Sequence, residues 1–108
     1  MQNYEFKEYK CSLLGGGQGK VSIINDNIVW KKSMSNFLAG GLLAFMTKRD
    51  QVIEIKNIIH METCSIVGSA GIQIFTNQGK RFKFGFVNKK ERDDFLFILN
   101  NKINNNSN

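Results

Sequence analysis

The stretch GIQIFTNQGKRFKFGFV, residues 71–87, decides the fold class because its pattern is that of a β-hairpin. Ile72 and Ile74 share one face before the turn Asn77-Gln78-Gly79, and phenylalanine recurs at every second position after it. Period-two alternation is typical of strands with one buried face. The phenylalanines fall opposite the cations Arg81 and Lys83, so we expect three of them in the core: Phe82, Phe84 and Phe86.

Two segments upstream of this hairpin also have strand character. KVSIINDNIVWKKS, residues 20–33, contains two β-rich runs around Asn25-Asp26-Asn27. Asparagine and aspartate tolerate left-handed backbone, so this turn predicts a tight hairpin. QVIEIKNIIHME, residues 51–62, alternates at its start, and we expect Ile53 and Ile55 on the buried face of one strand.

The C-terminal part of the chain predicts a helix. Asn88 can cap its first turn, and Glu91 stands three residues later, as in a capping box. Apolar residues then recur at helical spacing: Phe95, Leu96, Leu99 and Ile103. We expect a helix over residues 88–101 that covers the open end of the sheet. The domain spans residues 1–103, and the polar, asparagine-rich tail, residues 104–108, is expected to be disordered.

The order of these elements and their motifs resemble a known family. Residues 53–99 resemble the second half of GRAM and bacterial pleckstrin-homology-like domains, in which a strand leads to a (D/N)I step, here Asn57-Ile58, then to a loop, a hairpin, an aromatic strand and a helix. GKVSIINDNIVWKKS is similar to the family's GxLxLTNxRLxF hairpin. The matching positions are Gly19, Val21, Ile23, Asn25 and Trp30. The family's Leu-Thr is Ile23-Ile24 here, and its arginine is Asn27.

This resemblance implies a fold and a class of function. The implied fold is mainly β, a pleckstrin-homology-like barrel or sandwich of about seven antiparallel strands capped by one C-terminal helix. Domains of this family bind lipid head groups, peptides or other proteins and are generally not enzymes. The chain is therefore expected to be non-catalytic and to need no cofactor.

The glycine-rich stretch LLGGGQGKV, residues 13–21, raises the alternative of a phosphate-binding loop. The pattern G-x-x-x-x-G-K-[ST] requires glycine where this chain has Leu14 and a hydroxyl where it has Val21. A β-rich segment follows instead of a helix. We therefore expect a connection between strands and no bound nucleotide, with the backbone freedom supplied by Gly15, Gly16, Gly17 and Gly19.

The composition favours a globular, basic protein. Of 108 residues, 42% are hydrophobic, and 15 Lys and Arg against 9 Asp and Glu give a net charge of +6. Such a charge attracts phosphates of lipid or nucleic acid, or serves solubility alone. No signal peptide is recognisable, so the expected location is the cytoplasm, peripheral at a membrane if lipid is bound. There Cys11 and Cys64 are expected to stay reduced, and the single histidine, His60, leaves too few ligands for zinc.

An apolar segment over residues 37–46 interrupts the polar middle of the chain. It is too short to span a bilayer, which takes about 20 apolar residues. Three interpretations compete: a buried turn or short helix, an oligomer contact, and a loop that dips into a membrane. The residues that would make the contact are Phe37, Leu38, Leu42, Leu43 and Phe45.

The leading functional hypothesis is a binding module for an anionic membrane surface or a protein partner. The candidate cations for lipid phosphate are Lys20, Lys31, Lys32, Lys48 and Arg49. The alternative is a structural protein that self-associates through residues 37–46 without a lipid ligand. Binding of single-stranded nucleic acid is less favoured, because the phenylalanines that could stack on bases fall opposite the cations. No constellation of acids and bases indicates an enzyme; the candidates were His60, Glu62, Asp93 and Asp94.

Overall fold

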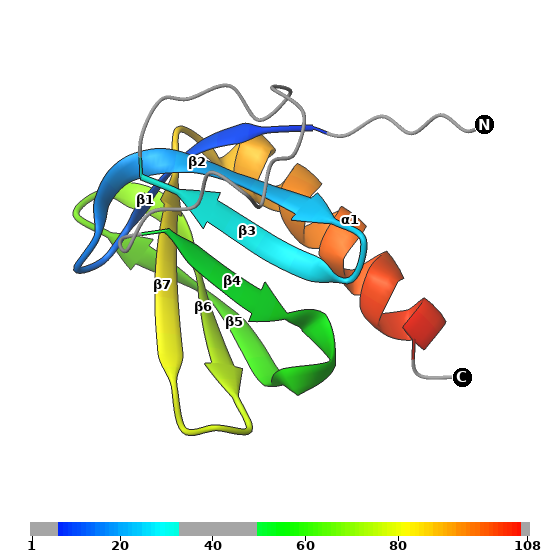
Figure 1. Ribbon diagram of the computed structural model, residues 1–108. Helices are drawn as coiled ribbons and strands as arrows, with labels where there is room; N and C mark the ends of the chain where they lie inside the picture. The colour runs from blue at the N-terminus through cyan, green and yellow to red at the C-terminus, as the bar shows by residue number, and fades with distance from the viewer. Residues whose placement is uncertain (1–6, 33–49, 107–108) are drawn as a thin grey trace.

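Seven β-strands and one long helix form the part of the chain that the computed structural model describes, residues 7–32 and 50–106 (Figure 1). The strands are β1 (Tyr9–Leu13), β2 (Gly17–Ile24), β3 (Asn27–Lys31), β4 (Gln51–Glu54), β5 (Ile58–Ile66), β6 (Ser69–Thr76) and β7 (Arg81–Phe86). A short 3₁₀ helix, Ile55–Asn57, separates β4 from β5, and helix α1 spans Lys89–Asn106.

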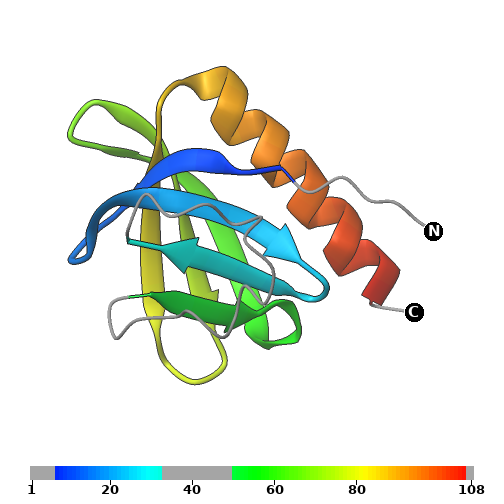
Figure 2. The ribbon, with the colours of Figure 1, turned by 45° about the horizontal axis from the view of Figure 1, so that its top comes forward.

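All strand pairs are antiparallel, in the order β4-β3-β2-β1-β7-β6-β5. β1 pairs with both β2 and β7 and so joins the two halves of the sheet. The sheet curls into a partial barrel, and α1 lies along one end of it (Figure 2). This is the predicted barrel or sandwich of antiparallel strands with a capping C-terminal helix, and the prediction of the fold class is confirmed.

The two predicted hairpins are present with the expected faces. In β2–β3, Val21 lies opposite Trp30, and the turn places Asn25 in the left-handed region at φ 57°. In β6–β7, Ile72 lies opposite Phe84, and both side chains are fully buried. Phe86 is buried as well, and Phe82 packs partly buried against the core. The alternation of residues along these strands therefore predicts correctly which side chains of the two hairpins face the core.

The prediction of a strand at the start of residues 51–62 is confirmed over Gln51–Glu54, but its extension to Ile55 is wrong, because the chain turns a corner there. β4 ends at Glu54, and the 3₁₀ helix carries the chain into β5. The Ile55 N–H donates to the Asp26 carbonyl at 3.0 Å, and the Asn57 carbonyl accepts from Asn77 N–H at 2.8 Å. Ile55 is still buried, since the turn keeps its side chain toward the core. The loop implied after Ile58 is the nine-residue strand β5.

Helix α1 begins as predicted and ends later. The Asn88 Oδ1 accepts the Glu91 N–H at 2.9 Å, which satisfies one free donor of the first turn. The expected end at Asn101 is wrong: the helix continues to Asn106. Ile103 packs against the core, and Lys102 Nζ lies 3.4 Å from Asp26 Oδ1 of the β2–β3 turn. These contacts hold the last turns on the sheet despite their weak helix propensity.

Aromatic side chains dock α1 on β1 and β7. Phe95 is fully buried, with its ring centroid 5.6 Å from that of Tyr9 and 5.3 Å from that of Phe86. Trp30 fills the centre of the core and donates its indole N–H to the Cys11 carbonyl at 2.9 Å.

Candidate functional site

The glycine-rich stretch forms the turn between β1 and β2, as predicted. The Gly16 N–H donates to the Leu13 carbonyl at 2.7 Å, and the Leu14 N–H donates to the Lys83 carbonyl of β7 at 3.0 Å. Gly15 and Gly17 have φ of +89° and +97°, a region that glycine adopts without strain. The turn lies on the opposite side of the molecule from α1 (Figures 1 and 2).

A hollow of about 500 Å³ opens beside this turn. Its lining comes from the β1–β2 turn and from the starts of β4 and β7: Leu13, Leu14, Gly15, Gly16, Gln51, Arg81 and Phe82. Arg81 is exposed and brings a guanidinium to the hollow, while Leu14 is 61% exposed at the turn. The hollow is thus lined by a cation (Arg81), by an exposed apolar side chain (Leu14) and by the backbone of Gly15 and Gly16.

A second, smaller hollow of about 240 Å³ adjoins the first, because Gln51 and Phe82 line both. It lies between β4 and the β6–β7 turn, and it adds Lys80 as a cation and Glu54 as an anion. The two together follow the gap between the edge strand β4 and β7.

Lys32 also reaches the glycine turn. Its Nζ donates to the Gly16 carbonyl at 2.8 Å, and its backbone N–H donates to Asp50 Oδ1 at 2.8 Å. The ammonium is therefore held at a residue that lines the larger hollow. Of the candidate cations among the described residues, Lys32 is the one that contacts this turn.

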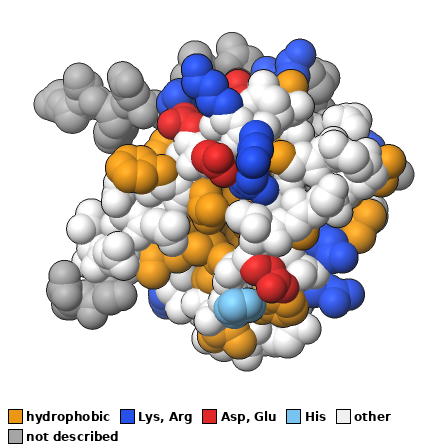
Figure 3. All heavy atoms as spheres, turned by 180° about the vertical axis from the view of Figure 1, so that it is seen from behind, with side chains coloured by type: hydrophobic (Ala, Val, Ile, Leu, Met, Phe, Trp, Pro, Cys, Tyr) orange, Lys and Arg blue, Asp and Glu red, His pale blue; other side chains and the backbone are white. Residues whose placement is uncertain are grey.

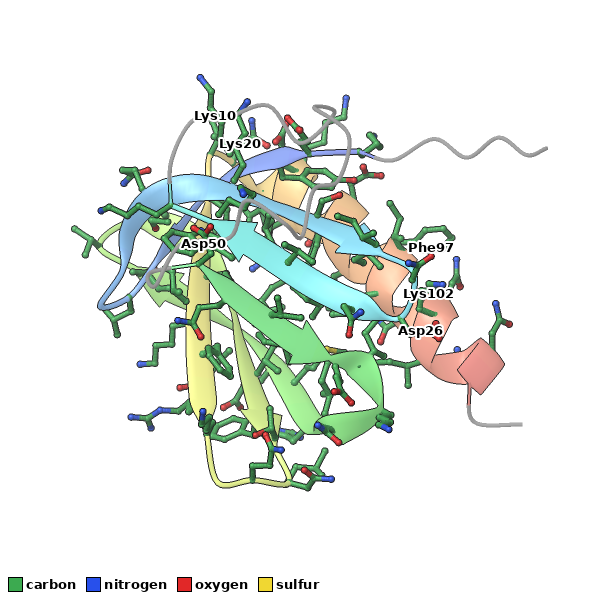
Figure 4. The ribbon with its side chains drawn as sticks, in the orientation of Figure 1. Lys10, Lys20, Asp26, Asp50, Phe97 and Lys102 are labelled. Atoms are coloured by element: carbon green, nitrogen blue, oxygen red, sulfur yellow. The ribbon has the colours of Figure 1, made fainter. Side chains whose placement is uncertain are left out.

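Lys31 has a different place from the one its sequence suggested. It is buried, and its Nζ lies 3.6 Å from Asp50 Oδ2, with side-chain exposures of 3% and 1%. Figure 4 labels Asp50. A cation enclosed in this way belongs to the fold and not to a lipid-facing surface. Local sequence patterns do not reveal this pair, because Asp50 precedes β4 and becomes a neighbour of β3 only in the sheet.

Lys20 lies on the outer face of the sheet, away from the hollow. It stands opposite Lys10 in the β1–β2 register, and both side chains project from the same region (Figure 4). Lys20 Nζ lies 3.3 Å from Glu8 Oε1, which balances its charge. The other predicted contacts, Lys48, Arg49 and the apolar set of residues 37–46, lie outside the described residues.

Sequence reasoning missed Arg81 as a site residue. The run Lys80-Arg81-Lys83 was visible as a basic cluster, but period-two alternation assigned Arg81 only to the outer face of its strand. Its place at the glycine turn follows from the pairing of β1 with β7, which sets Leu13 opposite Phe84. A pairing between strands so distant in sequence cannot be read from local patterns.

The acidic residues and the histidine considered for catalysis lie in polar contacts dispersed over the surface. His60 Nε2 lies 3.7 Å from Glu62 Oε1, and Asp93 Oδ1 accepts from Arg92 Nε at 2.7 Å. Asp94 accepts from Tyr9 Oη at 2.6 Å and from Lys7 Nζ at 2.9 Å. Among the described residues, no three His, Cys, Asp or Glu side chains gather as a metal site would require.

Burial and hydrogen bonding shift the pKa values of Tyr9, Asp94 and Cys11. Burial, followed by the hydrogen bond to Asp94, raises the pKa of the Tyr9 phenol, while the Tyr9 hydrogen bond, followed by the one from Lys7, lowers the pKa of Asp94. Burial also raises the pKa of the Cys11 thiol. Cys11 and Cys64 are both free thiols, Cys11 buried and Cys64 half-buried. A thiol held protonated in the core acts as a small apolar side chain.

The phenylalanines of β7 do not form an open stacking surface, because Phe84 and Phe86 are buried and Phe82 packs against the core. Across the described ranges, no helix is both long and apolar enough to cross a bilayer. The comparison of the sequence with protein-family models gives no match, and neither does the comparison with curated proteins.

Proposed function

We propose that this chain is a non-catalytic binding module of the GRAM or pleckstrin-homology-like class, and that the hollow beside the β1–β2 turn holds an anionic head group of a membrane surface. The observation that supports this proposal most is the meeting of Arg81, the glycine turn and exposed Leu14 around one hollow of about 500 Å³. The resemblance of the sequence to the family and the barrel with its capping helix agree with it.

The charges of the hollow suit a phosphate group. A guanidinium can bind two phosphate oxygens at once through paired N–H donors, and Arg81 is exposed enough to do so. Lys32 adds a second cation at the Gly16 carbonyl. Gly15 and Gly16 present no side-chain branches that would keep a ligand from the backbone. The net charge of +6 would steer the chain toward an anionic surface.

Leu14 supplies the apolar part of a membrane contact. It is 61% exposed at the tip of the turn, on the side of the barrel opposite α1. An apolar side chain beside cations can enter the region between head groups and acyl chains while the cations meet phosphate. The arrangement thus favours shallow attachment to a surface over enclosure of a whole lipid.

The test is co-sedimentation with phosphatidylcholine vesicles that contain or lack phosphatidylserine or a phosphoinositide. Each cation near such a surface contributes about 1 kcal/mol, so Arg81→Ala should weaken binding about fivefold. Lys89→Ala, which removes an equal charge from exposed α1, is the matched control and should bind nearly as the wild type. Leu14→Ser should also weaken binding, and added salt should weaken it further.

Two results would overturn the proposal. The first is equal retention of Arg81→Ala and wild type by anionic vesicles, at unchanged thermal stability. The second is equal binding to vesicles with and without anionic lipid, which would remove the electrostatic basis. Binding of a soluble protein in place of vesicles would point to the other ligand class of the family.

A further inference from the structure

The sheet ends in two edge strands of very different length. β4 has four residues, whereas β5 has nine and, within residues 7–32 and 50–106, pairs with β6 alone. An edge strand presents backbone N–H and C=O groups that lack a strand neighbour and can pair with another chain. Most proteins protect such edges with lysine, proline, a bulge or a covering element.

β5 has little of this protection. Its nine residues include no lysine, arginine or proline, and Glu62 is its only acidic residue. The register with β6 shifts between Ile58 and His60, so a bulge disturbs the first residues. From His60 to Ile66 the pairing with β6 is regular. A regular stretch with a free edge is the geometry on which an added strand can form a ladder.

Helix α1 does not close this edge. It packs against β6, β7 and the 3₁₀ helix. Thr63, in the middle of β5, faces the barrel interior opposite buried Ile72, yet it is exposed. Figure 3 shows the molecule from behind, where the pale-blue side chain of His60 marks β5 and hydrophobic side chains lie open to view beside it. Met61 of β5 and Leu96 of α1 are among the apolar residues that the core only partly covers.

We propose that two copies of the chain associate through β5, antiparallel about a twofold axis at Thr63, so that their sheets become continuous. In this register Thr63 lies opposite Thr63 of the other copy, a favourable cross-strand pair. Glu62 lies opposite Cys64, and Met61 lies opposite Ser65. In this register, each residue of one copy lies opposite a residue of the other copy whose side chain points to the same face of the sheet. The bulge at Ile58 stays outside the paired stretch, and the two Glu62 carboxylates do not face each other directly.

The distribution of charge favours a second copy as the occupant. Each chain carries +6, so two copies repel each other through most orientations. β4, β5 and β6 contain no lysine or arginine, while β1, β2, β3 and β7 each carry at least one. β6 lies inside the sheet and the edge strand β4 has only four residues, so β5 offers two copies the longest cation-free edge on which to pair. The contact is isologous, and a twofold axis closes it at a dimer.

The first experiment measures the mass of the protein by light scattering over a concentration series without lipid. Wild type should form a dimer, and Thr63→Lys should raise the dissociation constant at least tenfold, because it places two ammonium groups opposite each other. Val67→Lys adds the same charge at the β5–β6 turn, where the side chain is 98% exposed, and should leave the dimer intact. A wild type that stays monomeric up to its solubility limit would overturn the proposal. So would a dissociation constant that Thr63→Lys leaves unchanged.

The second experiment tests the register and does not depend on a lysine being tolerated. In a Cys64→Ser background, Thr63→Cys should form an intermolecular disulfide on mild oxidation, because directly opposite residues lie within disulfide range. Val67→Cys is the control, and Cys11 is buried and should not compete. Cross-linking of Thr63→Cys no faster than the control would overturn the register. Both experiments omit vesicles, so their failure leaves the lipid proposal untouched.

Discussion

Lys31 Nζ lies 3.6 Å from Asp50 Oδ2, with both side chains almost wholly buried, and this pair ties the end of β3 to the residue that precedes β4. Asp50 Oδ1 also accepts the Lys32 N–H at 2.8 Å. Both carboxylate oxygens therefore face donors. An ion pair enclosed in this way stabilises little in net terms, but it makes the loss of either partner costly.

The first prediction concerns this pair. Asp50→Ala should lower the free energy of unfolding by about 3–5 kcal/mol, because Lys31 would remain buried without its carboxylate. The double change Lys31→Met with Asp50→Leu should cost less than Asp50→Ala alone, since it removes the charges of both partners together. Urea unfolding of the three proteins measures the difference. A loss below about 1 kcal/mol for Asp50→Ala would show that water reaches the pair.

The second prediction explains why glycine stands at position 19. A Cβ on Gly19 would overlap the Lys31 carbonyl oxygen and lie 2.8 Å from Trp30 Cζ2. Gly19→Ala should therefore destabilise the fold by about 1–3 kcal/mol, as overpacking does. Gln18→Ala, at the exposed neighbouring position, should change stability by about 0.5 kcal/mol at most. If Gly19→Ala kept full stability, the close approach of β2 to β3 would not be the reason for this glycine.

The sequence was sufficient for the hairpins because their signal is local. The alternation in residues 71–87 needs no knowledge of other strands to place Ile72, Phe84 and Phe86 inside. The corner at Ile55 was missed because Ile53 and Ile55 are two buried isoleucines spaced two residues apart. This spacing fits a continuous strand and a 3₁₀ turn equally well. The bonds that form the corner come from Asp26 and Asn77, which are remote in the chain.

The candidate site was predicted less well, for a related reason. Lys32 reaches the β1–β2 turn, where its Nζ donates to the Gly16 carbonyl. Lys31, its neighbour in sequence, is buried beside Asp50, on the face of the sheet opposite Trp30. Arg81 enters the hollow through the pairing of β1 with β7. Sites assembled from loops of several strands depend on such long-range pairings, which residue patterns do not contain.

The third prediction tests the phenylalanine face of β7. Phe84 is fully buried between Ile72 and Leu13 of the neighbouring strands, so Phe84→Ala should cost about 3–5 kcal/mol. The same change at Phe97, which is 65% exposed on α1 (Figure 4), is the matched control and should cost about 0.5 kcal/mol at most. Chemical denaturation measures both. A loss under about 1 kcal/mol for Phe84→Ala would mean that this face is open and would revive base stacking.

The last prediction concerns acid stability at the junction of β1 and α1. Tyr9 Oη and Lys7 Nζ both donate to Asp94 Oδ2, and the Tyr9 hydrogen bond, followed by that of Lys7, lowers the pKa of the Asp94 carboxyl. A carboxyl whose pKa is lower in the folded chain than in the unfolded chain, where it is about 3.9, stabilises the fold above that pH. This contribution is lost as the pH falls through the folded pKa, because the unfolded chain binds the proton first.

Wild type should therefore lose stability on acidification more steeply than Asp94→Asn, which has no carboxyl to protonate at this position. Tyr9→Phe removes the largest cause of the shift while keeping the ring that contacts Phe95, so it should raise the pKa of Asp94 toward its ordinary value. Urea midpoints at about pH 6 and about pH 3 compare the slopes, and a carboxyl NMR titration follows Asp94 itself. Equal acid sensitivity of wild type and Asp94→Asn, with an Asp94 pKa at or above about 3.9, would show that the Tyr9 and Lys7 contacts do not persist in solution.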